Sequence, residues 1–109
     1  MRAYELMLIC DGGLEESEVA KIINQVTAEV QEAGGTVPKT DKWGRRRFAY
    51  EINHKTEGFY VVFEIEAEPG ALDRLDRTLR LADDVVRHKI IRLPDSEAER
   101  RGLLGTAAG

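Results

Sequence analysis

The hydrophobic positions along the chain change their spacing several times, and each change marks a new element. From residue 2 to residue 10, apolar side chains occupy both alternating sets, which is typical of a β-strand covered on both faces. From residue 15 to residue 33 they recur every three to four residues, as in an amphipathic helix. The segments Asp11-Gly12-Gly13 and Gly34-Gly35 interrupt these patterns, as turns and helix ends do. The first third of the chain therefore predicts a strand and then a helix.

The remainder of the chain predicts three further strands and one further helix. Pro38 marks the second strand as an edge strand, because proline cannot donate a hydrogen bond to a strand ladder. The second helix has Leu72, Leu75 and Leu79 as its buried stripe. The predicted elements are strands at residues 36–52, 58–67 and 85–93, a polar turn at 53–57, and a helix that begins after Pro69-Gly70.

This order of elements predicts an α+β fold. It is the order of a ferredoxin-like βαββαβ sandwich, in which a four-stranded antiparallel sheet carries two helices on one face. The apolar periodicity stops after Pro94. Residues 1–93 are therefore predicted to form one ferredoxin-like domain that binds RNA or protein, and residues 94–109 a flexible C-terminal tail.

Two helices cover only one face of such a sheet, so apolar side chains on the other face are expected to contact a partner. Met7, Val61 and Phe63 share the odd parity of their strands, and we expect them in a protein contact together with Trp43. A shift of one residue in the predicted register would exchange the two faces.

The charge of the chain is unevenly distributed. The 109 residues carry 16 Lys and Arg against 20 Asp and Glu, and this net charge of −4 argues against a general nucleic-acid binder. Seven acidic residues lie within residues 5–32 beside one lysine, whereas residues 36–55 hold six cations and two acids. Residues 85–93 add three cations and no acid. An acidic body with two basic segments indicates docking by one surface.

The most basic segment runs from Lys42 to Ile52. Its alternation predicts that Arg45 and Arg47 point to one side of a strand and Phe48 and Tyr50 to the other. Gly44 is expected at a bend or bulge. Guanidinium groups bond phosphate oxygens in pairs, and an indole ring offers a base a surface to stack on. Taken alone, three consecutive arginines are more often a solvated face beside a tryptophan packed at a turn.

The residues that support catalysis or metal binding do not form a recognisable pattern. Cys10 is the one cysteine, which excludes an internal disulfide and a cysteine-based zinc site. His54 and His88 lack neighbouring ligands in the sequence, and the paired glycines lack the spacing of a phosphate loop. We expect no catalytic residue, no cofactor, no metal and no small-molecule substrate. The longest apolar run, Phe59 to Phe63, is far below the roughly 20 residues of a membrane span, and the polar N-terminus predicts a cytoplasmic protein.

The basic segment resembles a known family signature. Trp43-Gly44-Arg45-Arg46-Arg47-Phe48-Ala49-Tyr50, with Ile52 two positions later, is similar to the signature of the bacterial small-subunit ribosomal protein S-six family. It departs from that signature at Phe48, where leucine is usual. The N-terminal residues Met1-Arg2 with Tyr4-Glu5, and the later Leu79-Arg80-Leu81 with Val85-Val86-Arg87, resemble the family as well. The resemblance extends from about Arg2 to Leu93.

The resemblance implies a structural constituent of the small ribosomal subunit. Such a protein would bind the central domain of small-subunit ribosomal RNA as a heterodimer with small-subunit protein S-eighteen. Five of the cations expected to face RNA occupy positions where similar family members carry a cation, and the other three residues follow from charge and exposure. The first group is Arg2, Arg46, Arg47, Arg80 and Arg87, and the second is Trp43, Arg45 and Arg92.

Two alternatives share the predicted topology. The first is a stand-alone RNA-recognition domain. Residues 57–63 resemble the third-strand motif of that domain only weakly, because Glu57 stands where the motif has a cation. The second is a ferredoxin-like enzyme or ligand-binding protein that forms a dimer through the open sheet face. A tight homodimer with a bound small molecule would favour the second alternative.

Overall fold

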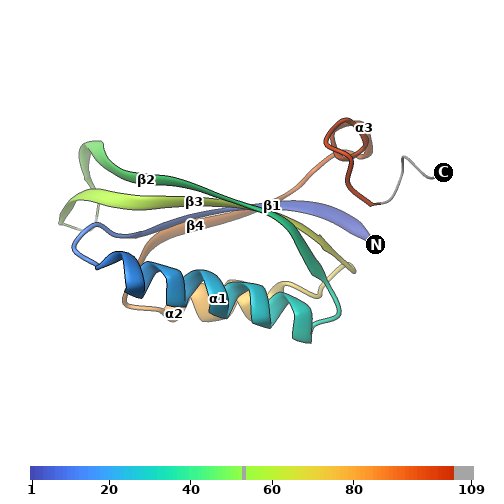
Figure 1. Ribbon diagram of the computed structural model, residues 1–109, viewed down its shortest axis with the longest axis horizontal. Coiled ribbons are helices and arrows are strands. Elements are labelled where there is room, and N and C mark those ends of the chain that lie inside the picture. Colours follow the sequence, from blue (N-terminus) through green and yellow to red (C-terminus); the bar gives the residue numbers. More distant parts are fainter. Residues whose placement is uncertain (53, 105–109) are drawn as a thin grey trace.

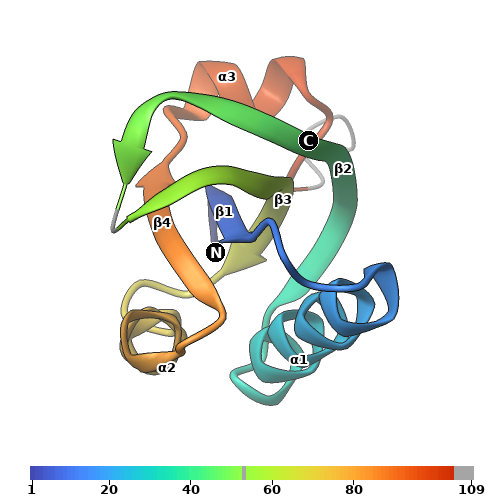
Figure 2. The same cartoon turned by 90° about the vertical axis from the view of Figure 1, so that its left-hand side faces the viewer.

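A computed structural model of the chain describes residues 1–52 and 54–104, and it shows one twisted sheet with helices on both sides (Figure 1). The four strands are ordered β2-β3-β1-β4, and every neighbouring pair is antiparallel. Helices α1 and α2 lie side by side against one face (Figure 2). The predicted ferredoxin-like α+β fold is confirmed. The elements are β1 (Arg2–Asp11), α1 (Glu16–Glu32), β2 (Thr36–Ile52), β3 (Lys55–Ala67), α2 (Asp73–Leu81), β4 (Val85–Arg92) and α3 (Asp95–Arg100).

The main core lies between the sheet and helices α1 and α2. Leu6 pairs with Phe63 across β1 and β3, and Leu8 pairs with Val61, so these four side chains point to the same face. All four are fully buried. Each helix contributes one apolar stripe: Val19, Ile23, Val26 and Val30 from α1, and the predicted Leu72, Leu75 and Leu79 from the region of α2.

This register corrects part of the predicted protein contact. Val61 and Phe63 lie under the helices with no exposed surface, so they are not available to a partner protein. Met7 pairs with Val62 and points to the opposite face. The prediction compared residue numbers between strands, but only the pairing register decides which parities share a face.

The β2–β3 hairpin contains the bulge expected at Gly44. The register shifts between Lys42 and Gly44, which leaves Trp43 as the extra residue, and Gly44 has a φ of +88° that favours glycine. β3 begins at Lys55, so the strand takes in three residues of the predicted 53–57 turn. Asn53 lies outside the described residues.

The segment after β4 differs from the predicted flexible tail. Residues 95–100 form α3, which lies on the side of the sheet away from α1 and α2 (Figure 1). Ala98 and Leu103 are buried against Ala3 and Leu93 in a second, smaller cluster. An apolar stripe of so few residues has no detectable period, which is why the sequence pattern missed it. Residues 105–109 of the predicted tail lie outside the described part.

An arginine attaches the end of α3 to the sheet. The Nη1 atom of Arg101 lies 3.2 Å from carboxylate oxygens of both Glu5 and Glu64, and its Nε donates to Glu97 at 2.9 Å. The backbone N–H of Leu104 donates to the Glu66 carboxylate. Three strand carboxylates are therefore bonded by the segment that follows α3.

We predict that Leu103→Ala loosens α3 without unfolding the sheet. Removing this buried side chain costs about 2 kcal/mol, the lower end for a core leucine. The locally open population should rise by roughly 30-fold, and trypsin cleavage after Arg100 or Arg101 should accelerate accordingly. Leu81→Ala is the matched control, because Leu81 is 75% exposed on α2. Equal cleavage rates in the two variants would show that Leu103 does not hold α3.

Helix α2 is joined to β4 by a histidine–aspartate contact. The Nε2 atom of His88 lies 2.7 Å from Oδ1 of Asp76, and Arg80 lies 2.5 Å from the other carboxylate oxygen. The hydrogen bond from His88 is the main reason that the pKa of Asp76 is lowered from 3.8. The folded state therefore favours the ionised Asp76 carboxylate.

The free energy of unfolding at acidic pH should depend on this contact. A carboxyl with a lowered pKa in the folded state stabilises the protein above its unfolded pKa, and that contribution disappears as the pH falls through the folded value. We expect the free energy of unfolding of the unmodified chain to fall more steeply below about pH 4 than that of Asp76→Asn. Urea titrations across this range would measure it, with Asp73→Asn on the same helix as control. Parallel curves for the chain and Asp76→Asn would contradict the prediction.

Candidate nucleic-acid and protein interface

The face of the sheet opposite α1 and α2 is partly uncovered, and we refer to it as the open face. The registers place Met7 between Val62 on β3 and Lys89 on β4, and they pair Ile9 with Tyr60 and Arg87. α3 covers the end of this face near Ala3. The outer part of the β2–β3 hairpin lies on the same side (Figure 1). The open face therefore lies between the hairpin and α3.

Aromatic side chains of the hairpin pack together on this face. The rings of Trp43 and Tyr60 are stacked with centroids 6.4 Å apart and planes at 8°, and Phe48 meets Tyr60 edge-on at 6.3 Å. Gly58 makes this packing possible, because a Cβ there would lie 2.5 Å from Ile9 Cγ2 and 2.8 Å from Phe48 Cζ.

Trp43 and Arg46 form the accessible part of this cluster. The guanidinium carbon of Arg46 lies 5.1 Å from the centroid of the indole ring, within cation–π range. Trp43 remains 42% exposed. A half-exposed indole beside an arginine offers a stacking surface and a positive charge together, which suits a base with its phosphate or the side chain of a partner protein.

The three consecutive arginines are divided between two sides of the hairpin, as the alternation predicted. Arg46 pairs with Gly58 and shares the open side with Tyr60, whereas Arg45 pairs with Phe59, whose side chain belongs to the helix-side core. The Nη2 atom of Arg45 donates to the carbonyl oxygen of Leu14 at 3.1 Å, which ties the hairpin to the loop before α1. Arg45 therefore has a structural contact, while Arg46 is presented on the open side.

β4 adds further cations to the open face. Arg87, which the sequence analysis selected, points to the same side as Met7 and is exposed. Lys89 lies two residues later on the same side and was not selected. Its shared parity with Arg87 on one strand is the sequence signal that would have identified it. Arg46, Arg87 and Lys89 thus lie toward the hairpin and β4 on the open face, and Lys39, which pairs with Glu64, lies nearer α3 on the same side.

The remaining predicted cations lie elsewhere. Arg80 is on α2 beside Asp76, and Arg92 lies 3.8 Å from Asp95. Arg2 is at the start of β1 and exposed, opposite Ala67. Arg47 pairs with Glu57 on the side of the hairpin that Arg45 occupies. The eight residues selected from the sequence therefore do not form one patch, and only Trp43, Arg46 and Arg87 share the open face.

The end of the open face near α3 has a different character. A shallow hollow of about 190 Å³ lies there. Its carboxylates outnumber its cations, and Arg101 already bonds two of them. The open face is therefore basic toward the hairpin and β4 and mildly acidic toward α3. The residues that line this hollow are Glu5, Lys39, Asp41, Trp43, Val62, Glu64 and Arg101.

The described residues offer neither a metal-binding cluster nor a reactive cysteine. Within residues 1–52 and 54–104, no three histidine, cysteine or acidic side chains are placed to hold a metal ion. Burial, with a smaller contribution from the charge of Asp84, raises the pKa of Cys10 to about 11, so the thiolate nucleophile is disfavoured. None of the helices in the described part is both long and apolar enough to span a membrane.

Comparisons with known proteins agree with this geometry. Residues 3–92 match the family model of ribosomal protein S6. The small ribosomal subunit protein bS6 of Salinispora tropica is 52% identical over 92 residues, which are 84% of this chain and 96% of that protein. The corresponding protein of Streptomyces coelicolor is 46% identical over 92 residues, which are again 84% of this chain and 96% of that protein.

A solved structure agrees as well. The 30S ribosomal protein S6 of Thermotoga maritima has a TM-score of 0.84 to this chain at 30% identity, covering 92% of this chain and 94% of that one. The sequence match and the structural match cover the same βαββαβ domain, which carries the hairpin signature. The chain therefore belongs to the ribosomal protein S6 family of the small ribosomal subunit.

Proposed function

We propose that this protein binds the central domain of small-subunit ribosomal RNA as a heterodimer with small-subunit protein S-eighteen. Its family consists of structural proteins of the bacterial small subunit and is not a class of enzymes. The protein is accordingly a component of the cytoplasmic ribosome. Different surfaces of the chain are proposed to contact RNA and protein S-eighteen.

The observation that carries the RNA contact is the cationic end of the open face. Arg46 and Arg87 reach it from β2 and β4, strands at opposite edges of the sheet, and Lys89 adjoins Arg87. The half-exposed Trp43 lies at the same end. Cations on phosphates supply most sequence-independent affinity for RNA, and the acidic α1 side would be repelled. This arrangement orients the protein with its hairpin toward the RNA.

The other predicted cations are assigned to separate contacts. Arg45 and Arg47 lie on the far side of the same hairpin, and we propose that they contact RNA that continues around its tip. Arg2, Arg80 and Arg92 lie outside both groups, and a role for them in RNA binding requires a second RNA segment.

The protein contact is assigned to the middle of the open face. Met7 and Val62 are half-buried neighbours there, with Trp43 at one side and the mildly acidic hollow beyond. A small apolar centre with an acidic margin suits a basic protein. A bound basic protein would also offset the net charge of −4, which opposes RNA binding by this chain alone.

Specific observations disfavour the two alternatives. A stand-alone RNA-recognition domain needs free aromatic rings on its central strands, but Tyr60 is covered by Trp43 and pairs with the aliphatic Ile9. A ligand-binding dimer needs a concave site, and the hollow on the open face measures only about 190 Å³. Ligand sites typically enclose roughly 300 Å³ or more.

We predict that Arg46→Ala with Arg87→Ala flattens the salt dependence of RNA binding. A central-domain RNA fragment would be titrated with this protein, with protein S-eighteen, and with both, at several salt concentrations. Tight binding is expected only with both proteins. The slope of log K against log salt should fall by roughly 0.7 to 0.9 for each phosphate that the variant no longer neutralises.

The control for this titration is Lys21→Ala with Arg77→Ala, which removes the same charge from the exposed surfaces of α1 and α2. An equal change of slope in the control pair would assign the effect to net charge rather than to the open face. Tight selective binding without protein S-eighteen would favour the stand-alone RNA-recognition domain.

We also predict that Met7→Lys weakens the complex with protein S-eighteen in the absence of RNA. The substitution places a cation in the centre of a contact with a basic protein, and the affinity should fall by at least about tenfold. Calorimetry would measure the dissociation constant. Leu81→Lys makes the same chemical change at an exposed site on α2 and should leave the affinity unchanged. Unaltered binding by Met7→Lys would remove the protein contact from the open face.

A further inference from the structure

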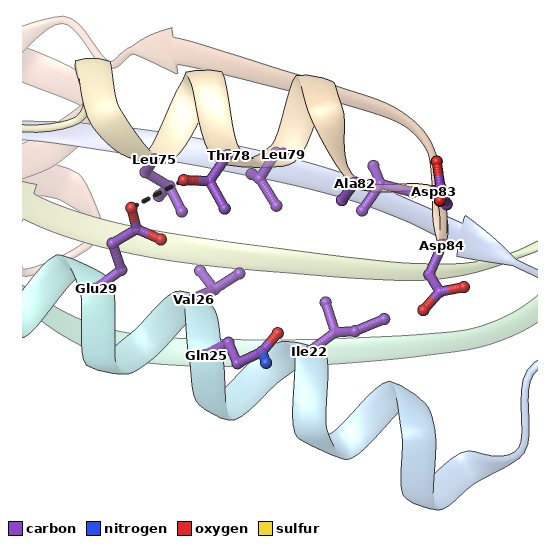
Figure 3. Close-up of a pocket in the computed structure, with 11 residues that line it drawn as sticks. Ile22, Gln25, Val26, Glu29, Leu75, Thr78, Leu79, Ala82, Asp83 and Asp84 are labelled. Carbon is purple, nitrogen blue, oxygen red and sulfur yellow. Dashed lines mark hydrogen bonds between the residues drawn. The ribbon is translucent and has the colours of Figure 1, made fainter.

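A groove lies between α1 and α2, on the side of the sheet opposite the open face (Figure 3). Its deeper part has a volume of about 110 Å³ and is floored by aliphatic side chains from three elements. An engineered cavity that holds benzene measures ~150 Å³, so this space suits one aliphatic side chain rather than a cofactor. The floor consists of Ile22 and Val26 from α1, Leu75 and Leu79 from α2, and Val85 from β4.

The groove continues along the two helices. A second, wider hollow shares Gln25, Glu29 and Thr78 with the first, so the two adjoin between the helices. Thr78 donates a hydrogen bond to Glu29 at 3.1 Å where they meet (Figure 3). We call the two adjoining hollows together the interhelical groove.

The rim of the interhelical groove is acidic. Its carboxylates are Glu29, Glu32, Asp83 and Asp84, and Arg74 is the cation among the lining residues of both hollows. Arg74 lies 3.7 Å from Glu29 and partly neutralises that end. At the other end, Asp83 and Asp84 are exposed, and neither forms an ion pair with a residue in the described ranges. Two unpaired carboxylates thus adjoin an aliphatic hollow.

We propose that the interhelical groove docks a basic segment of a neighbouring protein. One aliphatic side chain of that segment enters the hollow between Ile22 and Leu79, and flanking lysines or arginines pair with Asp83 and Asp84. RNA is a poor occupant, because its phosphates would face the carboxylates of the rim. The groove and the open face lie on opposite sides of the sheet, so both can be occupied together (Figure 2). This site does not depend on the proposed contacts with RNA and protein S-eighteen.

The test uses the full chain and a defined probe. The probe is an acetylated and amidated pentapeptide, Lys-Leu-Arg-Leu-Lys, and the peptide Glu-Leu-Glu-Leu-Glu is its charge-reversed counterpart. Amide chemical shifts of the ¹⁵N-labelled protein are followed at low salt. The basic peptide should shift Ile22, Val26, Leu79 and Asp84 in a saturable way. The acidic peptide should shift none of them.

Surface variants separate a groove site from general attraction to an acidic protein. Asp83→Asn with Asp84→Asn should weaken binding of the basic peptide by about threefold to tenfold, as expected for two exposed ion pairs. Glu16→Gln with Glu99→Gln removes the same charge outside the groove and should have little effect. Gln25→Glu adds a carboxylate to the rim and should tighten binding, whereas Gln25→Lys should weaken it.

Three results would overturn the proposal. The first is an equal loss of affinity in the Glu16 and Glu99 control pair, which would show that only net charge matters. The second is shifts of the groove residues that depend on protein concentration without peptide, which would identify a second copy of this chain as the occupant. The third is an absence of saturable shifts in the groove. None of these results depends on whether RNA or protein S-eighteen binds the open face.

Discussion

The pairing of β1 with β3 is the constraint on which the rest of the structure depends. Because Leu6 faces Phe63 and Leu8 faces Val61, the largest apolar side chains of the two central strands meet on one face. Burying that face requires both α1 and α2, so the helices lie on the same side. The residues of opposite parity on β1 and β3, such as Met7 and Val62, then point to the open face. One register therefore sets both the core and the surface proposed for binding.

Charge is divided less completely between the two sides, because Arg45 and Arg47 lie on the helix side and Glu5 and Glu64 on the open face. The helix side carries the acidic residues of α1 and the acidic rim of the interhelical groove. Arg46, Arg87 and Lys89 project from the open face. An acidic protein can approach RNA only when its cations are gathered at one surface, because sequence-independent affinity depends on phosphate neutralisation. The sheet gathers three of them by placing Arg46 of β2 and Arg87 and Lys89 of β4 on one side, although these strands lie at its two edges.

α3 limits the size of the open face. Its buried Ala98 and the following Leu103 cover the end near Ala3, and Arg101 bonds the carboxylates of Glu5 and Glu64. These two strand carboxylates are paired directly across β1 and β3, where like charges are destabilising, and Arg101 bonds both of them. The helix thus reduces negative charge on the surface where binding is proposed, and it leaves the end near the hairpin uncovered.

The sequence by itself determined the order of the elements, the helix stripe at Leu72, Leu75 and Leu79, the bulge at Gly44 and the family signature, because each is encoded by residues close together in the chain. Only the tertiary structure decided that Val61 and Phe63 are buried, that Lys89 joins Arg46 and Arg87, that Arg45 bonds the loop before α1, and that α3 packs on the sheet. These features depend on register and on contacts between residues distant in sequence. Strand parity cannot be compared between strands until their pairing is known, which is the physical reason that local patterns could not supply them.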